Sequence, residues 1–386
     1  MRAIDCQTFG GTFALAVKDA GFDLIAKREP AAGFGLPMYI GNLDLLGTRH
    51  VQADEPDNWR AEQTDLVFGN PACSGFSGLS TCVNKRDENG QRVGYRGIDS
   101  PANQGMWNLI DYAAACEPTI VIFESVTGAY TSGRELMRNL HEHLEFHTGA
   151  RYDLHHVLHN NVTLGGYAER NRYFFVASRV PFGVEYPDID RLLTLRDAIG
   201  DLESVPLGGT DGHHVAPTPR AVRLAELAAK AEWLPDEPAG EAWKRAQQAG
   251  VTLETWNADK PGVDSRTSMY AARRWNYDKP ARVLRQYASS ENVHPVLPRC
   301  FTYREAARIM GLPDTWTVQP AVDAGVNGQA WFGKGIPYKS GRWIADWAAA
   351  SLNNQPGNMR GNQIGDREYV IDVRKQPSWI ETPLPL

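Results

Sequence analysis

Four short apolar runs, separated by stretches of helical character, constrain the fold of this chain more than any other feature. The runs extend from Leu24 to Ala26, Leu66 to Phe68, Thr119 to Phe123 and Tyr173 to Ala177. Runs of this kind are typical of strands that are buried on both faces. Strands that alternate with helices predict an α/β fold, in which a mostly parallel sheet is covered on both sides and ligands bind beyond the carboxyl ends of the strands.

Capping signals and hydrophobic periodicity place several further elements. Capping boxes at Ser132–Glu135 and Thr302–Glu305 each predict the start of a helix. Periodic apolar residues predict helices from about Thr218 to Trp233 and from about Gly341 to Leu352, and a strand is expected at Tyr369–Val373. The sequence shows no internal repeat.

Composition indicates two lobes of different character. From about Pro181 to Gly262 the chain is rich in proline, glycine and acidic residues and lacks apolar runs of the buried-strand type, which predicts an insert or a second lobe. From Val263 to Met310 the charge becomes positive, and arginines stand among tyrosines and tryptophans. Such interleaving suits a phosphate backbone and exposed bases. A solvated rim with some buried aromatic side chains remains the alternative.

Overall composition excludes several classes of protein. Hydrophobic residues make up 42% and charged residues 22%, which is ordinary for a globular protein and unlike a disordered one. The five cysteines are scattered without a CxxC pair, so no metal site is expected. The N-terminus lacks a signal-peptide pattern and no apolar run reaches about 18 residues, so a cytoplasmic protein without a membrane partner is expected. The net charge of -6 argues against an indiscriminate nucleic-acid binder.

Of the five cysteines, Cys73 stands in the most informative context. It lies in a Gly/Pro loop, Gly69–Ser77, directly after a predicted buried strand, which is where a nucleophile is typically placed. A lone cysteine in a turn is more often structural, so the surrounding residues decide its role. The loop reads PACSGFS and resembles the PCQGFS nucleophile motif of the cytosine-5 DNA methyltransferases, with Ala72 in place of proline and Ser74 in place of glutamine. The resemblance implies that the Cys73 thiolate adds to carbon 6 of cytosine.

Two further segments resemble motifs of the same family, in the same order. The strand that ends in Glu124 resembles the ENV motif, with Ser125 in place of asparagine, and implies that the glutamate donates to ring nitrogen 3. Read without the family, this glutamate is equally well a helix cap or half of an ion pair. The segment around Arg170 and Arg172 resembles the QxRxR motif, with Ala168 in place of glutamine, and implies that both arginines orient the base and the backbone around it.

The N-terminal segment resembles the family's glycine-rich cofactor loop. Gln7 replaces the phenylalanine that is usual in the family, and Phe9 lies where a glycine is expected. This segment therefore departs from the family's pattern more than the other motifs do. The resemblance implies S-adenosylmethionine as cofactor, with Glu29 at the ribose hydroxyls and Asp54 at the adenine amine. The cofactor-binding residues expected in full are Phe9, Gly10, Gly11, Thr12, Phe13, Glu29, Asp54, Asn70, Pro71 and Lys334.

The C-terminal third also follows the family. Arg299 and the Thr302–Arg308 helix resemble its penultimate motif, and Gly333–Pro337 resembles its last, with Lys334 in place of asparagine. The resemblance implies a Rossmann-like methyltransferase domain at 1–180, a smaller target-recognition domain at 181–300, C-terminal motifs at 301–352 that return to the catalytic domain, and a tail of uncertain structure at 353–386. Expected nucleic-acid contacts are Ser77, Arg266, Arg273, Arg274, Arg282 and Arg285.

These motifs predict a monomeric bacterial or phage-encoded DNA cytosine-5 methyltransferase that acts on double-stranded DNA through Cys73, Glu124, Arg170 and Arg172. One alternative keeps the cysteine chemistry but uses a modified S-adenosylmethionine, with another one- or two-carbon unit, or an RNA substrate. Another is a catalytically silent relative that only binds DNA. Restriction partner, phage self-protection and orphan regulator all remain open as biological roles, and the target sequence cannot be deduced from one chain.

Overall fold

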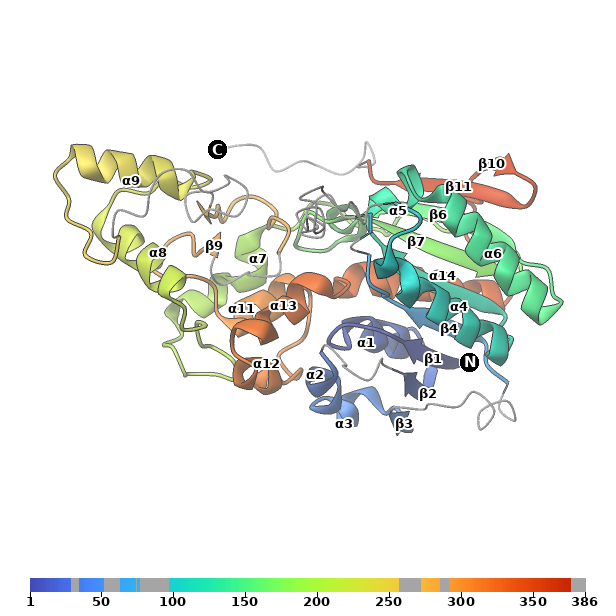
Figure 1. Cartoon of the computed structure of the whole chain (residues 1–386). Coiled ribbons are helices and arrows are strands. Elements are labelled where there is room, and N and C mark those ends of the chain that lie inside the picture. The colour runs from blue at the N-terminus through green and yellow to red at the C-terminus, as the bar shows by residue number, and fades with distance from the viewer. Residues whose placement is uncertain are drawn as a thin grey trace, which may run out of the picture.

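A central sheet organises the larger lobe of the protein (Figure 1). The computed structural model describes residues 1–28, 35–51, 63–73, 75–76, 97–256, 272–284 and 292–375. Within these residues nine strands form one sheet in the order β10-β11-β6-β7-β5-β4-β1-β2-β3. The strands of this sheet are β1 (Arg2–Cys6), β2 (Asp23–Arg28), β3 (His50–Val51), β4 (Leu66–Gly69), β5 (Ile120–Ser125), β6 (Asp153–Asn160), β7 (Asn171–Ser178), β10 (Asn362–Gly365) and β11 (Glu368–Val373).

The described residues also form α-helices and short 3₁₀ helices. The α-helices are α1 (Thr12–Asp19), α2 (Leu36–Ile40), α3 (Leu43–Leu46), α4 (Gln104–Cys116), α5 (Thr127–Thr131), α6 (Arg134–Thr148), α7 (Leu195–Ile199), α8 (Pro219–Lys230), α9 (Ala239–Gln248), α11 (Tyr303–Ile309), α12 (Gln319–Asp323), α13 (Val326–Lys334) and α14 (Tyr338–Leu352). Short 3₁₀ helices are η3 (Pro101–Asn103), η4 (Asn161–Leu164) and η5 (Gly200–Ser204).

The sheet is mostly parallel, as the sequence predicts. Strands β3, β2, β1, β4 and β5 run parallel to one another, β7 lies antiparallel between β5 and β6, and β11 is parallel to β6. The four apolar runs named above correspond to strands β2, β4, β5 and β7, although Thr119 of the third run precedes β5 by one residue. The carboxyl ends of β1, β4 and β5 therefore meet at one edge, where their following loops can form a site.

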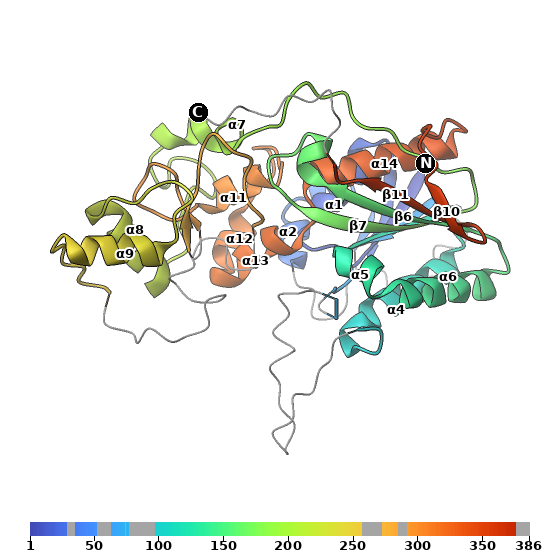
Figure 2. The same cartoon turned by 90° about the horizontal axis from the view of Figure 1, so that it is seen from above.

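Side chains that alternate along each strand build a separate core on each face of the sheet. Ala3 of β1 belongs to the core under α1 and α14, whereas the next residue, Ile4, belongs to the core under α4 and α6. Viewed from above, α1 and α14 lie on one side of the strands and α4 and α6 on the other (Figure 2). This three-layer arrangement confirms the α/β fold class.

Strand β6 was not predicted, because its apolar pattern is interrupted by histidines. His155, His156 and His159 are all buried within it. Glu368 of β11 accepts a hydrogen bond from His156 Nε2 at 2.9 Å and pairs with Arg138, so the C-terminal strand is joined to β6 by side chains as well as backbone. The strand expected at Tyr369–Val373 is confirmed as β11.

The helices expected from the sequence are present, but one capping prediction is wrong. Thr302 and Glu305 form the expected capping box at the start of α11. At α6 the N-cap is Gly133, which has no capping side chain, and the hydroxyl of Ser132 instead donates to the carbonyl of Gly128 at 2.9 Å. Ser132 ends the short helix α5, so its side chain satisfies that helix and is turned away from the next one.

The smaller lobe has a hydrophobic core of its own. Its buried members lie between Ala221 and Cys300 and include Trp233 and Trp256. Helices α8 and α9 pack on the two-residue strands β8 (Arg273–Arg274) and β9 (Asn292–Val293). By contrast, α7 packs into the core of the larger lobe through Leu195 and Ile199, and the exact domain limits stay a prediction.

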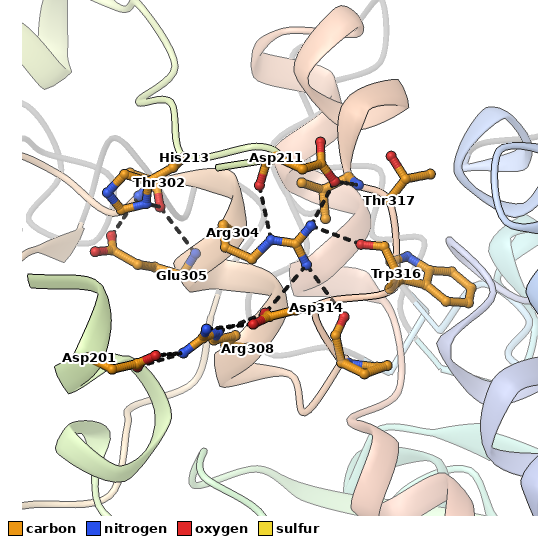
Figure 3. Close-up of polar contacts among 12 residues, drawn as sticks. Asp201, Asp211, His213, Thr302, Arg304, Glu305, Arg308, Asp314, Trp316 and Thr317 are labelled. Carbon is orange, nitrogen blue, oxygen red and sulfur yellow. Dashed lines mark hydrogen bonds and ion pairs between the residues drawn. The ribbon is translucent and has the colours of Figure 1, made fainter. Parts of the chain in front are cut away.

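A buried arginine on α11 joins the smaller lobe to the segment after that helix (Figure 3). Arg304 is 1% exposed; it donates to the backbone oxygen of Asp211 at 3.0 Å, to its carboxylate at 2.7 Å and to the carbonyl of Trp316 at 2.9 Å. Arg308, one turn later, pairs with Asp201 and Asp314, whose side chains are 65% and 61% exposed. Both arginines form ion pairs, but only Arg304 has a buried guanidinium, whose partner Asp211 is 36% exposed.

We expect Arg304→Met to lower the free energy of unfolding by about 3 kcal/mol, because the buried carbonyl of Trp316 and the backbone and carboxylate of Asp211 lose their shared donor together. Arg308→Met is the matched control and is expected to change it by less than about 1 kcal/mol, because its partners stay hydrated. Urea unfolding of both variants measures the difference. Equal losses in the two variants would contradict the assignment of Arg304 as the buried joint.

Candidate active site

The predicted nucleophile lies at the carboxyl edge of the sheet. Cys73 follows β4 in a loop whose backbone is turned by a 3.0 Å hydrogen bond from the N–H of Phe76 to the carbonyl of Cys73. Gly75 is required there, because a Cβ atom at this position would lie 2.6 Å from Oδ1 of Asn103. The thiol is partly exposed and forms no disulfide. It is therefore accessible, unlike the fully buried Cys6 and Cys300.

Glu124 ends the neighbouring strand and is 1% exposed. Its Oε1 pairs with Nε of Arg172 at 2.9 Å, and its Oε2 accepts a hydrogen bond of 2.5 Å from Nδ2 of Asn70. Burial raises the pKa of Glu124 to about 7, although Arg172 and Arg170 oppose the shift. Near neutral pH this carboxyl group can therefore carry a proton and act as an acid.

The two predicted arginines serve different partners. Arg170 is 3% exposed and donates through its two terminal nitrogens to the carbonyls of Gly333 at 2.8 Å and Gly335 at 2.9 Å. Burial and the neighbouring Arg172 lower the pKa of Arg170 to about 9, so it remains cationic at neutral pH. Arg172, on β7, pairs with Glu124 instead. Arg170 thus holds the Gly333–Pro337 segment against the site, and Arg172 binds the carboxyl group of Glu124.

Cys73 and Glu124 influence each other electrostatically. Burial and the Glu124 carboxylate raise the pKa of the Cys73 thiol, while Arg172, Arg170 and a hydrogen bond from the backbone of Val126 lower it. The net effect is a raised pKa of the thiol, and protonation of Glu124 removes one of the two causes of this rise. The pair can then hold one negative charge on sulfur and one proton on oxygen, which is the state that nucleophilic addition with acid assistance needs.

The predicted cofactor loop connects β1 to α1. Gly10 and Gly11 adopt positive φ angles of 67° and 84°, which only glycine adopts readily. The first turn of α1 has neither a capping side chain nor an acidic residue, so its N–H groups suit a negatively charged ligand. Thr12 and Phe13 are buried, and the Phe13 ring packs edge-to-face on Phe68 at 4.9 Å, so Phe13 can face a ligand only through its backbone.

A buried ion pair that the sequence did not reveal supports this loop. Lys27 of β2 and Asp5 of β1 are both fully buried, with Nζ 3.0 Å from Oδ1, and Lys27 also donates to the hydroxyl of Thr8 at 3.1 Å. The Thr8 hydroxyl in turn donates to Asp5 at 2.6 Å. A lysine directly after the apolar run of β2 was the available signal, because a lysine is rarely buried unless it is paired.

Lys334, at the end of α13, lies beside both the cofactor loop and the nucleophile. Its Nζ is 5.8 Å from the centre of the Phe9 ring. Burial lowers the pKa of Lys334, and the negative charge of Cys73 raises it, so the ammonium and the sulfur are electrostatically coupled. Phe9, Lys334 and Cys73 are thus brought together from three separate segments. Pro71, another expected cofactor residue, is buried in the loop before Cys73.

Some expected residues fall outside the described part of the chain: Glu29, Asp54, Ser77, Arg266 and Arg285. The remaining expected arginines, Arg273, Arg274 and Arg282, bind partners within the smaller lobe. Arg273 donates to the carbonyl of Asp236 at 2.5 Å, and Arg282 pairs with the carboxylate of Asp236 at 3.1 Å. Arg274 donates to three backbone carbonyls, those of Trp233, Pro295 and Val296. Their contact with nucleic acid stays a prediction.

A cavity of about 510 Å³ lies where α1, α7 and α11 end, lined by Asp19, Arg308 and Tyr338 among others, and none of the predicted catalytic residues lines it. Among the described residues no cluster of three or more histidine, cysteine, aspartate or glutamate side chains could hold a metal ion. No helix in these ranges is long and apolar enough to cross a membrane.

The sheet and the grouping of thiol, buried acid and two arginines at its carboxyl edge define a methyltransferase of the α/β class. A family model described as "C-5 cytosine-specific DNA methylase" matches residues 1–346. The chain belongs to this family of DNA cytosine methyltransferases, and the resemblance inferred from the sequence motifs is confirmed.

Individual relatives agree with this assignment. The chain is 25% identical over 348 residues to the type II methyltransferase M.XorII of Xanthomonas oryzae pv. oryzae, covering 81% of this chain and 76% of the relative. It is 28% identical over 202 residues to the type II methyltransferase M.AplI of Arthrospira platensis, covering 51% and 52% of the two chains. The crystal structure of the Entamoeba histolytica methyltransferase EhMeth shares the fold, with a TM-score of 0.58, 10% identity and coverage of 91% and 98%.

Proposed function

We propose that this chain transfers a methyl group from S-adenosylmethionine to carbon 5 of a cytosine flipped out of duplex DNA, through a transient bond between Cys73 and carbon 6. The observation that carries the proposal is the coupling of Cys73 with Glu124. The two groups follow adjacent parallel strands, influence each other's ionisation and share Arg170 and Arg172 as neighbouring cations. A DNA-binding relative without catalysis would not need this combination.

In the proposed reaction the Cys73 thiolate forms a bond to carbon 6 while Glu124, as the acid, donates to ring nitrogen 3. The addition makes carbon 5 electron-rich enough to form the new carbon–carbon bond. The bond between the donor sulfur and its methyl group breaks with the electron pair left on sulfur. Carbon 5 then loses its proton to a base, ring nitrogen 3 returns its proton to Glu124, and the bond between carbon 6 and Cys73 breaks to restore the thiolate. Arg172 keeps the Glu124 carboxyl oriented throughout.

The residues around the loop after β1 fit the proposed donor. S-adenosylmethionine, when bound, supplies an activated methyl group on a cationic sulfonium. The uncapped first turn of α1 would receive the carboxylate of its methionine part, and Gly10 and Gly11 allow the backbone to approach it. Phe9, Asn70 and Pro71 border the same edge of the sheet. We further propose that the protein acts in the cytoplasm, where its DNA substrate lies.

The test is tritiated methyl transfer to DNA by the purified protein, followed by mass spectrometry of nucleosides from the DNA and RNA of expressing cells. The expected product is 5-methylcytosine in DNA. 5-Methylcytosine found in RNA alone would show that the substrate is RNA. No modified nucleoside, together with no covalent complex on DNA that contains 5-fluorocytosine, would support a silent DNA-binding relative. Mapping the methylated positions would give the target sequence.

One observation favours a modified donor as the second candidate. The family's neutral asparagine is replaced by Lys334, whose ammonium lies beside Phe9 of the cofactor loop and is coupled to Cys73. The sulfonium of S-adenosylmethionine is itself positive and its methyl group carries no negative charge. The Lys334 ammonium therefore has no electrostatic attraction to this donor's transferable group. A transferable group that ends in a negative charge, such as a carboxylate, would be matched by it.

The two candidates predict opposite responses to Lys334→Asn. If the transferred group is anionic, the substitution is expected to weaken binding of a carboxylate-bearing sulfonium donor by about 10- to 100-fold, the loss of one charge-assisted hydrogen bond. Binding of S-adenosylmethionine is then expected to stay equal or improve. Isothermal titration calorimetry with both donors measures this without turnover. Unchanged affinity for the anionic donor would remove the second candidate.

A further inference from the structure

Asn70 differs from the other residues around Glu124, because its amide nitrogen forms a hydrogen bond and its buried amide oxygen forms none among the described residues. The residue is 3% exposed. Its Nδ2 donates to Oε2 of Glu124 at 2.5 Å. Its Oδ1 is buried and has no hydrogen-bond partner among the described residues. A buried amide oxygen without a donor is destabilising, so its retention beside a candidate active site indicates a ligand.

The register of the sheet explains how Asn70 reaches Glu124. Strands β4 and β5 are parallel, with Gly69 opposite Phe123, so the next residues along the two strands lie side by side. The backbone N–H of Asn70 donates to the carbonyl of Gln7 at 3.0 Å, which ties the same residue to the cofactor loop. Asn70 therefore stands where the cofactor loop, the nucleophile loop and the acid meet.

We propose that Asn70 is a specificity-determining residue of the cytosine site: its amide nitrogen positions the Glu124 carboxyl, and its amide oxygen accepts a hydrogen bond from the exocyclic amine of the flipped base. This inference rests on the proposed function and extends it to a residue that the motifs assign to the cofactor. Cytosine offers an amine at carbon 4, whereas uracil and thymine offer a carbonyl there, which would face Oδ1 as one acceptor against another.

Two substitutions separate the two halves of the amide. Asn70→Ala removes both the donor and the acceptor. The ratio of the variant's transfer rates on cytosine and on uracil at the mapped target is therefore expected to fall by about 10-fold or more relative to wild type. Asn70→Asp keeps an acceptor oxygen and is expected to retain most of that preference. Because the introduced carboxyl group and Glu124 would then share a site, the last proton of the pair is expected to leave at higher pH than in wild type.

The measurements are single-turnover transfer to duplexes that carry cytosine or uracil at the target, together with the pH profile of each variant. If transfer is too slow for a profile, infrared difference spectroscopy of the Glu124 carboxyl band gives the same titration, with Glu124→Gln to assign the band. Asn42→Ala is the matched control. Asn42 is 4% exposed, and its amide donates to the carbonyls of Met38 and Thr317, so its loss tests a buried amide elsewhere.

The outcomes separate this inference from the function on which it rests. Transfer by wild type, a reduced cytosine preference in Asn70→Ala and a shifted titration in Asn70→Asp support both, provided that Asn42→Ala changes neither readout. Normal transfer with unchanged preference and titration in both Asn70 variants would overturn the inference alone. Absence of transfer by wild type would overturn the proposed function itself, whatever the Asn70 variants do.

Discussion

Replacement of Cys73 by serine is expected to lower methyl transfer by at least about 10⁴-fold, the scale observed when a covalent nucleophile is removed. A serine hydroxyl stays protonated at neutral pH, and no described group beside Cys73 is placed to act as a strong base for it. Arg170, Arg172 and the Val126 N–H favour an anion, but they cannot generate an alkoxide. Transfer of tritiated methyl groups to DNA measures the loss.

Covalent trapping gives an independent readout of the same substitution. Wild type is expected to form a stable complex with DNA that contains 5-fluorocytosine at the target, because fluorine cannot leave as the carbon-5 proton does, and Cys73→Ser is expected to form none. Cys116→Ser is the matched control, since Cys116 ends α4 away from the loop after β4. Wild-type transfer by Cys73→Ser would disprove the covalent route.

Replacement of Glu124 by glutamine is expected to lower transfer by about 10²- to 10⁴-fold, the usual contribution of a general acid. The residue keeps its shape and can still bind Asn70, but it cannot supply a proton to ring nitrogen 3. Glu135→Gln, on the exposed side of α6, serves as the control for the same chemical change. A Glu124→Gln enzyme with wild-type kcat/KM would show that Glu124 is only a structural ion-pair partner.

The pH dependence of wild type follows from the direction of the Glu124 shift. Its pKa is raised from 4.5 to about 7 in the folded protein, and the active form is the protonated one, so kcat/KM is expected to fall as pH rises through about 7. Between these two values the folded state binds more protons than the unfolded state, so stability also declines with rising pH. Both trends are expected to be absent in Glu124→Gln.

The sequence predicted the sheet wherever its strands were continuously apolar. Strands β2, β4, β5 and β7 met that condition. Strand β6 did not, because His155, His156 and His159 occupy positions that are buried between neighbours contributed by distant segments. Burial lowers the pKa of His155 and His159 to about 3, so both remain neutral and behave as aromatic core residues. A single sequence cannot show that a histidine is buried, because the residue also suits the surface.

The candidate site was likewise predictable from the sequence only in part. Motif spacing was sufficient to place Cys73 and Glu124 at one edge of the sheet, because parallel strands bring their carboxyl ends together. Arg170 and Arg172 reach the same edge because β7 begins there and runs antiparallel to β5. The partner of each group was not predictable. Asn70 was assigned to the cofactor from its position before Pro71, and only the register between β4 and β5 reveals that its side chain binds the acid. Contacts of this kind depend on strand order in space.

The position of β11 has a consequence for how the protein is made. Residues 368–373 lie between β6 and β10, although more than half of the chain separates β11 from β6 in sequence. The central layer therefore cannot be finished until synthesis has passed through the smaller lobe and reached β11, the last strand of the described residues. Until then the backbone N–H and C=O groups along one edge of β6 have no strand beside them, and this edge can pair with the edge of another nascent copy. A segment beyond the family match, which covers residues 1–346, thus closes the edge of β6.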